Sequence, residues 1–136
     1  MNEWCYEIDE FRSEIDALQR QQFDKRMTEA EQADAWGKLK TMMKHGTEAR
    51  LRFDGKNPEA TVMTRCRFVI ELRPKPEPVM AFNRPQRVVR LYYCEPAAAP
   101  DRLLALHLGS KANSADRTEQ NASIDTAQTR AVDWAA

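Results

Sequence analysis

The residues that can bind or cleave a phosphodiester lie in the second half of the chain, on segments that alternate like β-strands. Arginine side chains hold phosphates through paired hydrogen bonds and stabilise the extra negative charge of a phosphorane-like transition state. Tyrosine can stack on a splayed base of single-stranded RNA. In the expected register one exposed face is the working surface, and it carries Arg67, Glu71, Arg73, Arg90, Tyr92, His107 and Lys111.

Acid–base chemistry on this face has two candidates. His107 is the only nearby group that ordinarily titrates near neutrality, so it can take a proton from a 2′-hydroxyl or give one to the leaving oxygen. Glu71 is the alternative base, or it merely orients Arg73 or Arg90.

A plainer interpretation is compatible with the same residues. Arginines on an exposed strand face are usually solvated, and cross-strand Glu–Arg pairs contribute little. A lone strand histidine is more often structural than catalytic. From the residues alone, the prediction is a basic sheet that could face RNA.

The charge distribution supports an anionic partner without identifying it. The net charge is zero, but residues 36–94 carry 13 basic against 5 acidic side chains. Residues 1–35 carry 4 basic against 10 acidic, and residues 95–136 carry 4 against 6. A basic middle favours binding of phosphate. Alternatively, acidic helices pack across the basic sheet and neutralise it.

Periodicity and capping patterns predict the elements that position these side chains. Asp9 can cap a first helix, and Thr28 with Glu31 has the reciprocal capping arrangement that begins a second. Gly46 is expected to end that helix in a left-handed conformation. The predicted elements are strands over 4–8, 65–73, 87–94 and 103–108, helices starting at Asp9 and Thr28, and a helix over 117–134.

This order predicts one α+β domain spanning residues 1–136. A small antiparallel sheet over 63–111 would be packed by an N-terminal helical hairpin and a C-terminal helix on one face.

Composition limits the chemistry further. The three cysteines are widely spaced and one must stay unpaired, which indicates a reducing, cytoplasmic setting. The sequence has no metal-ligand spacing, phosphate loop or dinucleotide-binding glycines, so neither a metal nor a cofactor is expected. Long apolar runs and a signal peptide are also missing, which predicts no membrane partner.

Three segments resemble the RelE/ParE toxin superfamily, most closely its HigB-like, phage-derived branch. Phe68–Arg73 (FVIELR) resembles a family strand that ends in Glu-Leu-Arg. Arg87–Tyr93 (RVVRLYY) resembles the next strand, with its arginine followed by aliphatic residues and tyrosine. Leu104–Lys111 (LALHLGSK) resembles the last strand, whose end carries a glycine followed by basic residues.

The resemblance implies the toxin of a toxin–antitoxin pair that cleaves mRNA on the ribosome, without a metal. By position, Arg90 would be the transition-state arginine and Lys111 the basic residue after the last strand. Arg73 would contact phosphate, and the implied fold is a RelE-like, microbial-RNase-like α+β arrangement. Apart from the resemblance, the RNA-binding candidates on the predicted sheet are Arg67, Arg73, Arg87 and Tyr92. The implied partners are a cognate antitoxin and mRNA on the ribosome, in a homodimer or a toxin–antitoxin hetero-oligomer. The alternative is a non-catalytic member of the same fold, either a gyrase-directed ParE-like toxin or a phage protein that binds a host factor.

Overall fold

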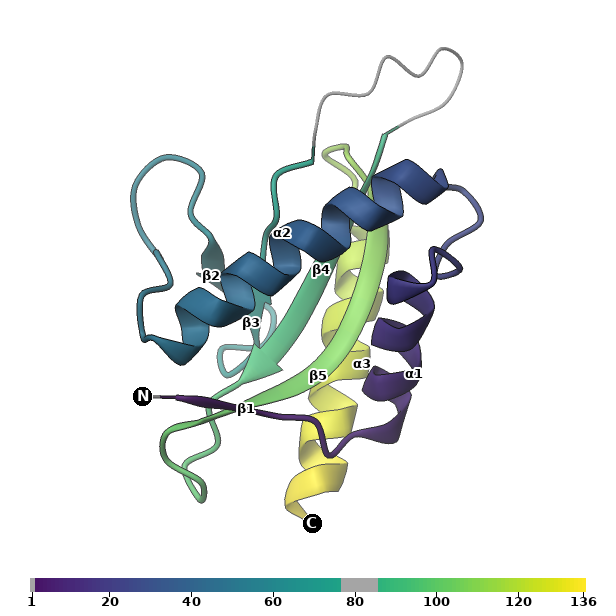
Figure 1. Ribbon diagram of the computed structural model, residues 1–136. Helices are drawn as coiled ribbons and strands as arrows, with labels where there is room; N and C mark the ends of the chain where they lie inside the picture. Colours follow the sequence, from purple (N-terminus) through teal and green to yellow (C-terminus); the bar gives the residue numbers. More distant parts are fainter. Residues whose placement is uncertain (1, 77–85) are drawn as a thin grey trace.

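The computed structural model describes residues 2–76 and 86–136 (Figure 1). Within them the chain forms three helices and one five-stranded mixed open sheet, so the α+β class is confirmed. The elements in chain order are β1 (Glu3–Cys5), α1 (Asp9–Gln19), α2 (Glu29–Thr47), β2 (Ala60–Val62), β3 (Ile70–Leu72), β4 (Arg87–Cys94), β5 (Arg102–Ala112) and α3 (Thr118–Ala135).

The sheet has the strand order β1-β5-β4-β3-β2, and the two longest strands, β4 and β5, form its centre. Neighbouring strands are antiparallel except β1, which pairs parallel to β5, with Trp4 opposite Leu103. The prediction of a wholly antiparallel sheet is therefore wrong at this edge. No hairpin turn joins β1 to β5, so chain connectivity does not impose the antiparallel direction.

Helices cover both faces of the sheet rather than one. Figure 1 shows α2 in front of β4 and β5 and α3 behind them. All eight residues of β4 are buried as a result. The predicted exposed working surface is therefore wrong, because α3 lies on it. The alternation of apolar and polar residues along the strands does not mark a solvated face. It reflects one apolar and one polar face of the sheet, each covered by a helix.

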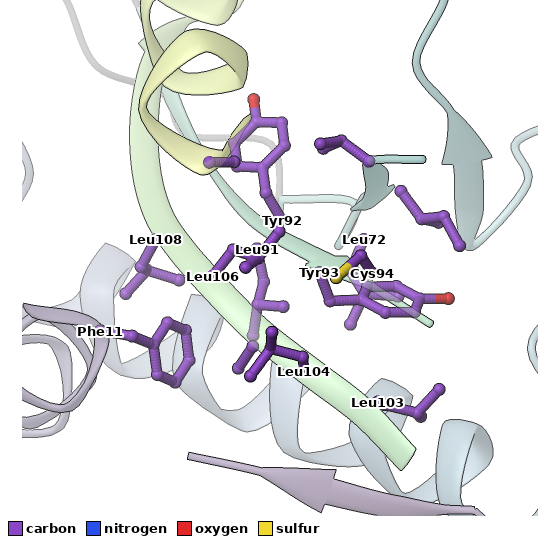
Figure 2. Close-up of a cluster of buried hydrophobic side chains, with 14 of the residues drawn as sticks. Phe11, Leu72, Leu91, Tyr92, Tyr93, Cys94, Leu103, Leu104, Leu106 and Leu108 are labelled. Atoms are coloured by element: carbon purple, nitrogen blue, oxygen red, sulfur yellow. The ribbon is translucent and has the colours of Figure 1, made fainter. Parts of the chain in front are cut away.

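The apolar layer is continuous across the central strands. Leu72, Leu91 and Leu108 lie opposite one another in the register and are buried. Figure 2 shows Phe11 from α1 beside Leu108, on the side of the sheet away from Tyr92. Burying these side chains supplies the main driving force for folding, about 1.5–3 kcal/mol for each.

The segment predicted as one long strand over 65–73 is a strand only at Ile70–Leu72. The Val69 amide donates to the Cys66 carbonyl, and the Met63 amide donates to the Val69 carbonyl. Residues 63–69 therefore form the connection from β2, a strand that the sequence analysis did not identify. An alternating pattern cannot distinguish such a turn from an extended chain.

The second helix begins as predicted but ends later. The Thr28 hydroxyl accepts from the Glu31 amide, and the Glu31 carboxylate accepts from the Thr28 amide, as in a capping box. Gly46 is not the left-handed residue that ends the helix. That conformation occurs at Ala49, with φ of 55°. Gly46 instead lies inside α2, where a Cβ would come within 3.2 Å of Leu103 and 3.3 Å of Trp4.

The last helix lies close to the sheet through small side chains. Its buried residues are Ile124, Ala127 and Ala131. Gly109 of β5 lies beneath it, and a Cβ there would overlap Ser123 Oγ. The close approach of α3 thus depends on glycine and alanine.

No helix in the described residues is both long and apolar enough to cross a membrane. The three cysteines are buried free thiols. Burial raises the pKa of the Cys94 thiol to about 11.

Candidate functional site

Four polar side chains form a row across the sheet, under α3. The register places Thr61 of β2 opposite Glu71 of β3, Glu71 opposite Tyr92 of β4, and Tyr92 opposite His107 of β5. Residues paired across neighbouring strands project to the same face, with Cβ atoms about 4.5–5.5 Å apart. The strands therefore bring together residues that are 46 positions apart in the chain.

Glu71 is the centre of this row and is fully buried. Its Oε2 accepts hydrogen bonds from the Tyr92 hydroxyl at 2.8 Å and from Gln120 Nε2 of α3 at 2.9 Å. Its Oε1 lies 3.2 Å from Arg73 Nε and 3.7 Å from Arg90 Nε, without a well-aligned hydrogen bond. A buried carboxylate is stable only with such compensation, so the two arginines and two neutral donors hold it in place.

Arg90 supports Glu71 from inside the protein. It is 8% exposed, and its Nη1 donates to the carbonyls of Pro74 and Val89. Burial lowers the pKa of its guanidinium, and the Glu71 carboxylate opposes that change. An arginine starts from so high a pKa that it stays charged near neutrality. Arg90 is thus a buried counter-charge to Glu71, which differs from the predicted direct contact with a scissile phosphate.

A hollow of about 380 Å³ opens above Glu71, between the β2–β3 connection, the end of β5 and the start of α3. Its lining is strongly basic, with Glu71 at its floor. The cationic residues that line it are Arg65, Arg73, Lys111 and Arg117.

These cationic side chains differ in how far acidic groups of the protein already neutralise their charge. Arg65 forms a two-pronged ion pair with Asp125 of α3, at 2.7 and 3.0 Å. Arg73 contacts Glu71 but keeps 38% of its side chain exposed. Burial lowers the pKa of Lys111; Glu71 opposes the shift, while the positive charges of Arg90, Arg73 and Arg117 add to it. A crowded group of cations around a hollow favours an anionic ligand.

His107 lies outside the hollow, in a separate polar cluster between α1, β5 and α3. Its Nδ1 is 3.2 Å from Glu14 Oε2 and 3.1 Å from Arg130 Nη1, and its Nε2 is 3.3 Å from Ser123 Oγ. Burial opposes ionisation of Glu14, but hydrogen bonds from His107 and Arg130 outweigh it and keep the Glu14 pKa below its usual value. The predicted joint site of His107, Arg90 and Lys111 therefore does not form.

Tyr92 also has a role different from the predicted one, which was to stack on a base of RNA. It is 1% exposed, its ring is stacked with that of His107 at 6.0 Å, and its hydroxyl is bonded to Glu71. Burial and the Glu71 charge raise the pKa of Tyr92. The ring cannot receive a base without removal of α3.

The two remaining predicted contacts lie away from the hollow. Arg87 is buried, with Nε 3.1 Å from Asp24 Oδ2 and its terminal nitrogens on Glu119 and Ser110. Burial opposes ionisation of Asp24, but bonds from Arg26 and Ser110 hold its pKa well below the ordinary value. Arg67 is exposed in the β2–β3 connection and does not line the hollow.

Three residues of the site were not identified from the sequence. Thr61 belongs to β2, which has no alternating pattern of its own. Gln120 and Arg117 were placed on the predicted last helix and at its start, but no pattern in the sequence shows where that helix docks. Of the predicted residues, the structure gathers Glu71, Arg73, Arg90, Tyr92 and Lys111.

The described residues contain no group of three or more His, Cys, Asp or Glu side chains that could hold a metal ion. No family model matches the chain, and no curated protein or solved structure matches it either.

Proposed function

We propose that this protein cleaves RNA at the hollow above Glu71. The observation that carries the proposal is the buried Glu71 carboxylate in the lining of a basic hollow, where Oε1 lies beside Arg73 and Arg90 without an aligned hydrogen bond from any described residue. The cations around the hollow can hold a phosphate beside this carboxylate, which can accept a proton from the bound RNA.

The chemistry uses the protein's own groups. Glu71 Oε1 accepts the proton of a ribose 2′-hydroxyl, the 2′-oxygen forms a bond to phosphorus, and the bond from phosphorus to the 5′-oxygen breaks. Arg73, Lys111 and Arg117 offset the charge that develops on the phosphate. Lys111 is the nearest candidate to return a proton to the leaving 5′-oxygen, because its lowered pKa makes that transfer easier. The products are a 2′,3′-cyclic phosphate and a free 5′-hydroxyl.

Cleavage of a single-stranded RNA by the purified protein tests this proposal. The wild type should give fragments with cyclic phosphate ends, and Glu71→Gln and Lys111→Ala should reduce the rate by about 100-fold or more. Lys44→Ala is the matched control, since Lys44 is exposed on α2, across the sheet. Fragments produced equally by all variants would indicate a contaminating nuclease and contradict the proposal.

The cellular role proposed from the family resemblance is a toxin that cuts mRNA on the ribosome and is held inactive by a cognate antitoxin. Inducible expression in a bacterium, with primer extension of bulk mRNA, tests that role. Growth arrest with discrete cuts that vanish in Glu71→Gln is the expected outcome. Absence of arrest would contradict the toxin assignment.

A second function on the same fold is binding without cleavage. The position of His107 favours it, because Glu14, Arg130 and Ser123 hold that side chain away from the hollow. Arrest without cuts, retained in Glu71→Gln, would support a non-catalytic toxin directed at gyrase or another host factor.

A further inference from the structure

Thr61 and Glu71 have a further property in common, which among the described residues is also found at Arg90 Nε and the Tyr93 hydroxyl. Thr61 Oγ1 and Glu71 Oε1 are both buried atoms without a hydrogen-bond partner among the described residues. They project from facing positions of β2 and β3, and both residues line the basic hollow. Two unsatisfied polar atoms thus belong to paired residues that both line the hollow.

The hydroxyl of Thr61 is costly where it lies. Leaving a buried polar group unpaired costs about 1–3 kcal/mol. Valine has nearly the same shape, suits a strand at least as well, and would avoid that cost. Natural proteins pair the great majority of their buried polar groups, and the exceptions tend to lie at functional sites. The position therefore indicates a hydroxyl that is paired only when a ligand is present.

The two atoms together define which hydrogen-bonding groups that ligand must have. Glu71 Oε1 can only accept a hydrogen bond when ionised, whereas Thr61 can donate one. A ribose 2′-hydroxyl satisfies both, since it donates to Glu71 and accepts from Thr61. The neighbouring 3′-phosphate would then face Lys111, Arg73 and Arg117, the cations of the same hollow.

We propose that Thr61 is a substrate-contacting residue that recognises the ribose 2′-hydroxyl and so selects RNA over DNA. This rests on the proposed function and adds a specificity residue to it. Arg73 is the movable part of the site, because its half-exposed side chain covers Glu71 Oε1 from 3.2 Å in the ligand-free protein. An incoming phosphate would draw its guanidinium away and uncover that oxygen.

Binding of nucleotides that cannot be cleaved tests the inference separately from catalysis. Calorimetry would compare the four nucleoside 3′-monophosphates with their 2′-deoxy counterparts. The wild type should bind at least one ribonucleotide about tenfold more tightly than its deoxy form, as expected for one hydrogen bond to a charged group. Thr61→Val should weaken ribonucleotide binding and so reduce the ribose preference, because the hydrogen bond from the Thr61 hydroxyl is lost while that to Glu71 remains. It should leave deoxynucleotide binding unchanged.

Two further variants complete the experiment. Thr61→Ser keeps the hydroxyl and should keep the ribose preference, while Thr41→Val on α2 is a matched control that should change nothing. Denaturant unfolding tests the inference without a ligand. The free energy of unfolding of Thr61→Val should be at least that of the wild type, because the unpaired hydroxyl is gone.

Several outcomes would overturn the inference. These are equal binding of ribo- and deoxynucleotides by the wild type, no binding of any of them, equal weakening of both by Thr61→Val, or a marked loss of stability in that variant. Failure of the RNA cleavage assay alone would count against the proposed function and leave a measured ribose preference standing.

Discussion

The hydroxyl of Tyr92 donates a 2.8 Å hydrogen bond to Oε2 of Glu71, directly opposite it on the neighbouring strand. This contact defines the structural roles of both residues. Tyr92 is a donor that orients a carboxylate instead of a platform for a base. Glu71 has one oxygen occupied by neutral donors and the other turned toward two arginines and the basic hollow.

Tyr92→Phe should destabilise the protein by about 2 kcal/mol, because a buried carboxylate loses one of its two donors. The free energy of unfolding in urea measures this. Tyr6→Phe is the control, since Tyr6 is 42% exposed and should change stability by less than about 0.5 kcal/mol. Equal stability of wild type and Tyr92→Phe would show that this hydrogen bond contributes nothing net.

Gly109→Ala should destabilise the protein by about 1–3 kcal/mol, because its new methyl group would overlap Ser123 Oγ and push α3 from the sheet. Adding Ser123→Ala removes that oxygen and should recover much of the loss. Thermal unfolding of both single variants and of the double variant measures how strongly the stability effects of the two substitutions depend on each other. Simple additivity of the two changes would contradict the packing described here.

Asp24→Asn should reduce stability at pH 7 by about 3 kcal/mol, since buried Arg87 loses one of its two counter-ions and keeps only Glu119. The folded-state pKa of Asp24 lies below its unfolded value, so its stabilisation is complete above about pH 5. That stabilisation is lost as the pH falls toward the folded pKa, and the gap between variant and wild type should narrow on acidification. Urea unfolding from pH 7 to pH 3 checks this, with exposed Asp133→Asn as control. A gap independent of pH would contradict it.

Binding of inorganic phosphate should begin to weaken at a lower pH than it would if Lys111 had the pKa of an exposed lysine. Burial and the surrounding cations lower the pKa of Lys111, so its charge is lost at a lower pH than that of an exposed lysine. Lys111→Arg keeps its charge throughout and should flatten the profile between pH 8 and pH 10. Calorimetric titration measures both proteins. Identical profiles would exclude Lys111 from the phosphate site.

The sequence by itself determined most of the local structure. The capping box of Thr28 and Glu31 and the β-favouring run of β4 depend on neighbours a few residues away, so the second helix and the central strands could be predicted. Strand alternation correctly put Glu71, Tyr92 and His107 on one face, because side chains in a strand alternate with a period of two.

Only the tertiary structure decided what covers that face. The docking of α3 depends on the close approach of Ser123 to Gly109 and on the bond from Gln120 to Glu71, between residues far apart in the chain. That docking buries Tyr92 and brings Ser123 and Arg130 of α3 onto His107, and β2 adds Thr61 opposite Glu71. Burial of Glu71 then requires the compensation that Arg73, Arg90, Tyr92 and Gln120 provide, because the free energy of a charge depends on everything packed around it.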